Sequence, residues 1–472
     1  MTTADAEAVL ARIAEADART VDFRFTDLCG QWRHLGYAAG GVMAELLTEG
    51  VMFDGAALPG WRGVNESDML LKPDLSSGLL DPFSAQPSLI LYCDVVEPGI
   101  GFGYERDPRS TARRAEEHLA RSNVADLALF APEPEFFVFD DVRFRVSPHE
   151  AFFRVDGEEA AHNAATAYEN GNTGHRPTPG RGYLAAGPRD AFADLRAEMA
   201  TVLQGLGFGR VHHHHEAEAG QCEVGFDPAP LVASADRVQA FKYAVHNVAA
   251  SYGKTATFMP MPLAEGCGLA LHVHQSLRRA DGGSVFAGTG YADLSEACLH
   301  YIGGVLHHAR ALNAFANPTT NSYRRLAPGL ATPRLLAYAA RNRSAAVRIP
   351  HAASAEGKRV EVRFPDPAAN PYLALAALLM AGLDGIERRL DPGEAMDRNL
   401  YDLPPEEVED VPTVCRTLDE ALRALDADRE FLTKGEVFGD DLIDAYVACK
   451  REEVEALARA PHPLEFELYY SV

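Results

Sequence analysis

The sequence has little positive charge for its length. Its 472 residues include 44 lysines and arginines against 68 aspartates and glutamates, and the formal net charge is -24 at pH 7. No segment gathers its basic residues into a run. A chain with this balance has no general electrostatic attraction for nucleic acid or for an anionic membrane. We therefore expect neither of them as a partner.

Long apolar runs and paired cysteines are missing too. No stretch is long enough to span a membrane, and residues 1–21 form a charged amphipathic helix pattern without the apolar core of a signal peptide. The seven cysteines are scattered without a CxxC spacing. This usage predicts reduced thiols in a cytoplasmic protein and no disulfide framework.

The chain is long enough for two domains, and its apolar content of 47% is ample to fill both cores. The segment PGIGFGYERDPRS, residues 98–110, is a plausible boundary. We predict domains at residues 1–105 and 106–472. In the first, two strands flank a turn at Cys29 and Gly30, and in the second, helices span residues 110–122 and 191–205.

Residues 341–372 concentrate five arginines around the strand-like segment RVEVRF. The apolar positions 360, 362 and 364 alternate with Arg359, Glu361 and Arg363, so one face is core and the other is charged. Guanidinium groups beside a carboxylate suit a polyphosphate that is held together with a metal ion. In isolation, RVEVRF is more typical of a surface strand with paired charges. The number of similar segments elsewhere favours a site.

Three other strand-like segments also present ionisable side chains. These are Glu133 and Glu135, which alternate with prolines just before an aromatic strand, Glu216 and Glu223, and His272 with His274. Five carboxylates and an imidazole are too costly to bury without cations, so we predict one or two divalent ions. The oxygen-rich set favours Mg²⁺ or Mn²⁺ over zinc. Such ions beside arginines indicate phosphate chemistry.

A series of motifs runs nearly from end to end. It comprises FDGAALPGW, NESDM, APEPEFFVFD, HHHE with AGQCE, HVHQS, NPTTNSYRRLAPG, ARNRSAAVRIP, RVEVRFPDPAANPY, GEAMDRNLYDLPPEE and HPLEFELYYSV. Together they resemble the bacterial type I glutamine synthetase family. The resemblance implies an α+β protein with a small β-grasp-like N-terminal domain and a large catalytic domain with a curved antiparallel sheet and helices. It also implies a dodecamer of two hexameric rings, with sites between neighbouring subunits and the C-terminal tail locking the rings.

The same resemblance implies the reaction and the residues that perform it. ATP phosphorylates a carboxylate, normally that of glutamate, and an amine then attacks the acyl phosphate. One metal would be held by Glu135, Glu216 and Glu223, and the other by Glu133, His272 and Glu361. The nucleotide would contact His274, Ser276, Arg348 and Arg359. The catalytic residues would be Asp54, Arg343 and Arg363, and the amino-acid and amine pockets would include Tyr183, Cys267, Gly268, Arg325 and Ala331. Tyr401 matches a tyrosine that many members have adenylylated.

The departures from the family pattern cluster in the substrate pockets. Two serines usually follow the glycine after Asp54, but this chain has Ala56 and Ala57. Ala331 stands where the family has a glutamate that helps to bind and deprotonate ammonium, and Cys267 replaces an asparagine that contacts the amino acid.

One of the metal ligands is also ambiguous, because the spacing from Glu216 to Glu223 is one residue shorter than usual. Counting back from AGQCE places His215 in the ligand position. Counting forward from Tyr183 places Glu216 there, and we prefer Glu216 because the shortened part is a loop.

These differences lead to three hypotheses. The first is an ATP-dependent carboxylate–amine ligase that forms an amide of γ-glutamyl type with an amine other than ammonia, because a pocket without its carboxylate binds ammonium less well. The second is an ordinary glutamine synthetase whose flap is compensated elsewhere. The third is a catalytically weak regulatory homologue. The intact metal and phosphate residues argue against this third hypothesis.

Overall fold

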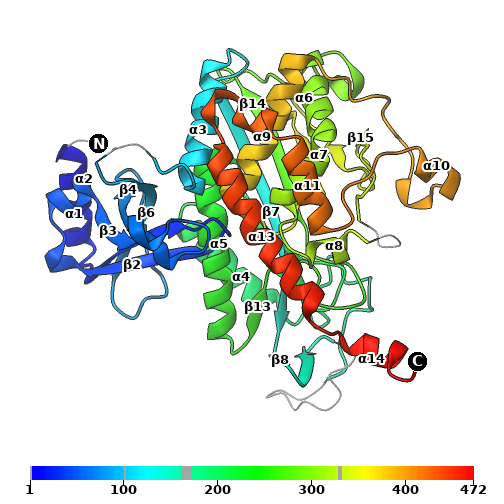
Figure 1. The fold of residues 1–472 in the computed structure, drawn as a ribbon, viewed down its shortest axis with the longest axis horizontal. Helices are drawn as coiled ribbons and strands as arrows, with labels where there is room; N and C mark the ends of the chain where they lie inside the picture. Colours follow the sequence, from blue (N-terminus) through cyan, green and yellow to red (C-terminus); the bar gives the residue numbers. More distant parts are fainter. Residues whose placement is uncertain (1–2, 100–102, 161–172, 328–331) are drawn as a thin grey trace.

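The computed structural model describes residues 3–99, 103–160, 173–327 and 332–472. Figure 1 shows a smaller N-terminal unit beside a larger one that carries most of the helices. No helix in the described ranges is long and apolar enough to cross a membrane. The seven cysteines all fall within these ranges, and each is a free thiol, as their usage predicts.

The N-terminal unit is built on a six-stranded sheet in the order β2-β1-β6-β4-β3, with β5 also paired to β6. Its strands are β1 (Thr20–Thr26), β2 (Trp32–Ala38), β3 (Val51–Asp54), β4 (Asp68–Pro73), β5 (Leu79–Leu80) and β6 (Ser88–Val96), and its helices are α1 (Thr3–Glu15) and α2 (Ala44–Glu49). The neighbouring β1 and β6 run parallel, whereas the turn at Cys29 and Gly30 joins β1 to β2 in antiparallel fashion. This is the β-grasp arrangement that the sequence predicts.

The larger unit holds a nine-stranded sheet in the order β10-β11-β7-β14-β17-β16-β15, with β12 and β13 also paired to β7. The strands are β7 (Leu127–Phe139), β10 (Val211–His215), β11 (Gln221–Phe226), β12 (Ala229–Pro230), β13 (Thr255–Thr257), β14 (Leu271–Arg278), β15 (Tyr338–Ala340), β16 (Val347–Ile349) and β17 (Val360–Val362). All of its pairs are antiparallel except β15 with β16. The α+β fold class is therefore confirmed. The domain boundary near residue 105 stays a prediction.

Strand β7 starts earlier than the sequence indicates. The sequence places Glu133 and Glu135 just before an aromatic strand, where they alternate with Pro132 and Pro134, which lack the N–H that a sheet requires. The strand nevertheless begins at Leu127. On one edge it pairs with β14, and on the other it pairs with β12 at residues 129–130 and with β11 from Glu135 onward. The prolines lie in the gap between β12 and β11, where no donor is needed.

The larger unit also contains helices, most of which pack against this sheet or against one another. They are α3 (Pro108–Arg121), α4 (Ala193–Gly205), α5 (Leu231–Ser251), α6 (Glu296–His307), α7 (Ala309–Ala316), α8 (Ser322–Arg325), α9 (Pro371–Arg388), α10 (Pro405–Glu409), α11 (Leu418–Ala427), α12 (Glu430–Thr433), α13 (Asp440–Arg459) and α14 (Pro463–Tyr469). Helix α9 is apolar on nearly all sides and is buried from Pro371 to Gly385. It touches α6 through glycines, because a Cβ atom on Gly304 would lie 2.0 Å from the Ala381 carbonyl oxygen.

Two segments expose apolar side chains at the edge of the molecule. One is the hairpin of β8 (Asp141–Ser147) and β9 (Glu150–Asp156), on which Phe144 and Phe153 are exposed. The other is α14, near the C-terminus at the lower right of Figure 1, on which Phe466 is 58% exposed, together with Tyr470 just after it, which is 80% exposed. Exposed aromatic groups of this kind mark contact surfaces for other chains.

Candidate active site

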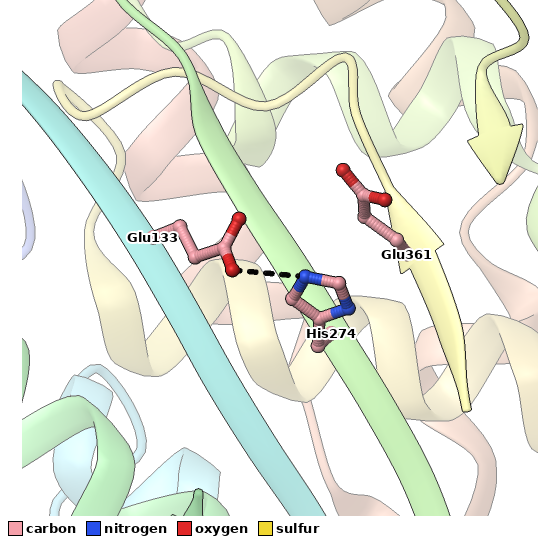
Figure 2. A group of neighbouring side chains, drawn as sticks. All are labelled: Glu133, His274 and Glu361. Atoms are coloured by element: carbon pink, nitrogen blue, oxygen red, sulfur yellow. Dashed lines mark hydrogen bonds and ion pairs between the residues drawn. The ribbon is translucent and has the colours of Figure 1, made fainter. Parts of the chain in front are cut away.

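Strand pairing brings three of the predicted segments together. The register of β14 places His272 opposite Glu133 on β7 and His274 opposite Glu361 on β17. Figure 2 shows Glu133, His274 and Glu361 pointing toward one another from three adjacent strands. In each segment, apolar side chains that face the core alternate with polar side chains that face the other way. Strand pairing aligns these polar faces across the sheet.

A cavity of about 540 Å³ opens over this face. Its lining includes most of the residues that the sequence singles out, namely Glu133, Glu135, Tyr183, Glu216, Glu223, Cys267, Gly268, His272, His274, Arg325, Arg343, Arg348, Arg359, Glu361 and Arg363. These side chains come from segments more than 200 residues apart in sequence. The structure thus gathers predicted metal, nucleotide and substrate residues around one space.

Arginines surround the carboxylate of Glu361, which is 1% exposed. Arg348 donates to one of its oxygens and Arg363 to the other. Burial opposes ionisation, but Arg363, followed by the nearby histidines and Arg348, holds the pKa of Glu361 below its usual range. Arg359 donates from Nε to His274 Nδ1 at 3.2 Å. The guanidinium groups form a cradle on the β16–β17 side of the cavity, suited to phosphate oxygens.

His272 stands between two carboxylates without touching either. Its Nδ1 atom lies 3.9 Å from Glu133 Oε2 and 4.0 Å from Glu361 Oε1. Burial, and after it the charge of Arg363, lowers the pKa of His272 well below its ordinary value, so the imidazole is neutral at pH 7. Ligand atoms about 2.1 Å from one ion lie about 3–4 Å from one another. His272 thus lies within reach of a cation shared with either carboxylate. The sets whose ligand atoms all lie within 4.8 Å of one another are Glu133, Glu223 and His272, and Glu133, His274 and Glu361, which differs from the predicted grouping.

The other carboxylate group, Glu135, Glu216 and Glu223, has no arginine or lysine hydrogen-bonded to it in the described parts of the chain. Burial raises the pKa of Glu135 to about 8, and the charge of Glu216 adds to the rise. Burial and the three neighbouring glutamates raise the pKa of Glu223 well above its usual value. Like charges in a buried space call for a cation, and of this group Glu216 and Glu223, together with His214, have ligand atoms within 4.8 Å of one another.

The position of Glu216 bears on the alternative ligand His215. Glu216 lines the cavity, and its Oε1 atom lies 2.7 Å from His214 Nε2. His215 is fully buried on the opposite face of β10, where its Nε2 atom lies 2.9 Å from Glu159 Oε2. Alternation along the strand separates the two side chains, and this geometry favours Glu216 as the ligand.

Among the predicted residues that the structure describes, three are not part of the cavity lining. Asp54 ends β3 in the N-terminal sheet and accepts a hydrogen bond from Ala56 N at 2.9 Å. Ser276 lies two residues beyond His274 on β14. Tyr401 donates from its hydroxyl to the Arg343 carbonyl oxygen at 3.4 Å, just outside the cavity. Ala331 lies outside the described residues.

The cavity also contains residues that sequence reasoning did not select. His212 and His214 line it, although a four-histidine run is often a solvated loop, and Gln221 donates to Glu135 at 3.1 Å. The available signal was the period of two, which places His212 and His214 on one face of β10 and continues to Glu216 just past its end.

The cavity places carboxylates that require cations beside several guanidinium groups. This combination is suited to the transfer of phosphoryl groups. The fold and cavity thus define a metal-dependent phosphoryl-transfer enzyme. Residues 17–98 match the family described as glutamine synthetase, beta-Grasp domain, and residues 105–469 match glutamine synthetase, catalytic domain. The chain belongs to the glutamine synthetase family, and it is an ATP-dependent C–N ligase that uses ATP with Mg²⁺ or Mn²⁺.

Individual relatives give the same result. The glutamine synthetases of Methylococcus capsulatus and Escherichia coli K12 are each 54% identical to this chain, over 98% and 99% of its length and over 99% and 100% of their own. A Plasmodium falciparum glutamine synthetase structure superposes with a TM-score of 0.90 at 26% identity, covering 98% of both chains. These relatives are named for the ordinary reaction, so they favour our second hypothesis over an altered amine.

Proposed function

We propose that this chain joins ammonia to the γ-carboxylate of glutamate with hydrolysis of ATP. The observation that carries the proposal is that one cavity holds the buried carboxylates, several of them in groups with histidines whose ligand atoms lie within 4.8 Å of one another, beside the arginine cradle. A homologue with only a regulatory or structural role needs neither. The burial of Glu361 and Glu223 without metal or phosphate would be costly, so a binding-only role does not account for them.

The residues of the cavity divide the chemical tasks. Glu135, Glu216 and Glu223 would hold one divalent ion, and Glu133, His272 and Glu361 the other. When bound, these ions neutralise charge on the phosphates of ATP. His274, Arg348 and Arg359 would orient the nucleotide, with Ser276 further along β14.

The substrate end follows the same division. Arg325, whose Nη1 donates to Phe364 O at 2.8 Å, would face the amino-acid carboxylate beside Cys267 and Gly268. Arg343 and Arg363 would stabilise the phosphoryl group as it moves to the γ-carboxylate. The nitrogen then attacks the acyl carbon, phosphate leaves, and a carboxylate accepts the amine proton.

A second candidate function uses an amine other than ammonia. It is favoured by specific residues, because Ala56, Ala57, Cys267 and Ala331 all remove polar groups from the two substrate pockets of the family. An alanine at 331 supplies neither charge for ammonium nor a base for its proton. Asp54 would then be the remaining carboxylate on the acceptor side.

Assembly completes the site in this proposal. Asp54 does not line the cavity of its own chain, and α14 exposes an apolar face, so both features suit a ring in which a neighbouring subunit supplies the missing groups. We propose a dodecamer of two hexameric rings in the cytoplasm, with Tyr401 as an accessible site for adenylylation.

Phosphate release from ATP tests the proposal directly. The assembled enzyme with glutamate should release phosphate and form glutamine when ammonium is added, with one phosphate for each amide. Release with primary amines but not with ammonium would replace ammonia by the second candidate. No release with any pair of carboxylate and amine would overturn the ligase function.

A further inference from the structure

Behind the metal ligands lies a buried histidine that the proposed reaction does not use. His215 is 0% exposed and occupies the face of β10 that points away from the cavity. Its Nδ1 atom lies 2.6 Å from the carbonyl oxygen of Glu216, and its Nε2 atom lies 2.9 Å from Glu159 Oε2. A carbonyl oxygen only accepts hydrogen bonds, so Nδ1 is the donor in the first contact. The imidazole thus donates a hydrogen bond to the backbone of a proposed metal ligand.

Glu159 is itself fixed from several directions. It is 2% exposed, and its Oε1 atom accepts from Ala191 N at 2.7 Å. Its Oε2 atom accepts from Gly220 N at 2.8 Å, in addition to facing His215. This one carboxylate ties the chain before α4 to the turn between β10 and β11. A side chain with three such partners is held in one geometry, so it can hold His215 in turn.

The same backbone reaches the acceptor side of the cavity. The carbonyl oxygen of His215 accepts from Leu184 N, and that of Ala217 accepts from Gly182 N, each at 2.9 Å. Between those donors lies Tyr183, a cavity residue whose ring packs edge-on against His214. A Cβ atom on Gly182 would lie 2.7 Å from Glu216 O, so the two segments are in close contact. Movement of the hairpin would displace Glu216 and Tyr183 together.

An ion at this second cluster is the competing explanation. Glu159, Asp190 and His215 offer ligand atoms within 4.8 Å of one another. Their polar atoms are already engaged, however, because Asp190 pairs with Arg196 at 2.5 Å, His215 uses both ring nitrogens, and Glu159 accepts two backbone hydrogen bonds. A cation would have to break these contacts. The geometry therefore favours a protein-only brace.

We propose that His215, held by Glu159, is a positioning residue that fixes Glu216 for metal binding and Tyr183 beside the acceptor. The proposal rests on the proposed function, in which Glu216 is a metal ligand. In the shortened hairpin, the contact between His215 and the Glu216 carbonyl sets where the following side chain enters the cavity. Loss of such a supporting partner lowers metal affinity by about 10–100-fold in metalloenzymes.

Two substitutions separate the contacts of His215. The amide nitrogen of asparagine overlays Nδ1 of histidine, so His215→Asn keeps the donor to Glu216 O and loses the contact with Glu159. The amide nitrogen of glutamine overlays Nε2, so His215→Gln does the reverse. Manganese binding to the assembled enzyme, the KM for glutamate, kcat and the melting temperature are measured for both. His215→Gln should weaken manganese binding by about tenfold or more, and His215→Asn by clearly less.

Matched controls complete the experiment. His300 also approaches a carbonyl oxygen, Leu390 O, through Nδ1 at 3.1 Å and a carboxylate, Glu296, through Nε2 at 3.5 Å, but it lies on α6. His300→Gln and His300→Asn should leave manganese affinity unchanged. If either His215 variant fails to fold, Glu159→Gln replaces it and should weaken manganese binding with a smaller change in shape.

The outcomes distinguish a failure of this inference from a failure of the proposed function on which it rests. Normal manganese affinity in Glu216→Ala would remove Glu216 as a ligand and with it both the metal assignment and the inference. Weakened affinity in Glu216→Ala together with normal affinity in His215→Gln and Glu159→Gln would overturn the inference alone. A fall in melting temperature without a change in affinity would reduce the pair to a structural role and would equally overturn it.

Discussion

His274 Nε2 lies 3.1 Å from Glu133 Oε1, across the ladder between β14 and β7. His272, two residues earlier on the same strand, keeps its Nδ1 atom 3.9 Å from the other oxygen of that carboxylate. The first contact is a direct hydrogen bond, whereas the second separation leaves room for an ion between the two groups. We therefore propose different tasks for these two histidines on one strand face.

The first prediction separates these tasks by substitution. His272→Ala should lower the affinity for Mg²⁺ or Mn²⁺ by more than about a hundredfold, since it removes a ligand rather than a supporting partner. His274→Ala should chiefly raise the KM for ATP, by about tenfold, the effect of one lost hydrogen bond to a charged group. Metal titration and ATP saturation curves measure the two. Equal effects of both variants on metal affinity would contradict the division.

The second prediction concerns protons that leave when metal binds. Burial and Glu216 raise the pKa of Glu135 to about 8, so this carboxyl carries its proton at pH 7 in the metal-free enzyme. A cation requires the ionised form, and binding should therefore release protons and tighten as the pH rises toward 8. Calorimetry of manganese binding at pH 7 in buffers of different ionisation enthalpy measures the release. Glu135→Gln should release fewer protons, and no release in wild type would contradict the assignment.

Much of the fold follows from the sequence because its signals are local. The alternation in residues 359–364 and 271–274 determines which side chains face the cavity, and the structure keeps it, with the ionisable positions in the cavity lining and the apolar positions in the core. The structure starts β7 at Leu127, ahead of Pro132 and Pro134, and a proline is compatible with a strand only where the edge that its nitrogen faces is unpaired. Only the complete sheet contains that information.

The arrangement of the site was harder to predict from the sequence than the fold. Which of His215 and Glu216 faces the cavity depends on the register of β10 with β11, which pairs His214 with Glu223. A shortened hairpin shifts that register by an amount that spacing alone does not give. The brace from His215 to Glu159 joins residues 56 positions apart. No pattern in the sequence connects them.

The third prediction follows the oxygen atoms of the acid substrate. Arg343 and Arg363 border the cavity beside the cation-demanding carboxylates, where they would stabilise phosphoryl transfer to a carboxylate. Glutamate labelled with ¹⁸O in its γ-carboxylate should deliver one labelled oxygen to the released phosphate. Mass spectrometry of the phosphate measures the transfer. Unlabelled phosphate, or cleavage of ATP to AMP, would rule out the acyl phosphate.

The fourth prediction concerns assembly. Leu464, Phe466 and Leu468 on α14 are each at least 50% exposed in the single chain, and burial of such a face against another subunit is strongly favourable. Light scattering should show a large ring assembly for the full chain. Deletion of residues 464–472 should leave smaller rings, whereas deletion of residues 471–472 should not. An unchanged mass after the longer deletion would contradict a locking role for the tail.

The last prediction decides between the two acceptors. Ala331 stands where the family has a glutamate, and one opposite charge near an ammonium ion contributes about 4 kcal/mol at an effective dielectric of about 20. A positioned base adds about a hundredfold to the rate. Ala331→Glu should therefore lower the KM for ammonium and raise kcat with it, and its charge and bulk should reduce any activity with larger amines. Competition between ammonium and primary amines for the acyl phosphate measures both effects, with Ala331→Gln as the uncharged control of equal size.

If wild type already forms glutamine rapidly and Ala331→Glu changes nothing, another group supplies the charge and the base, and the altered-amine candidate is excluded. If wild type discriminates against ammonium and only the glutamate variant restores it, position 331 sets the acceptor and the second candidate replaces the first.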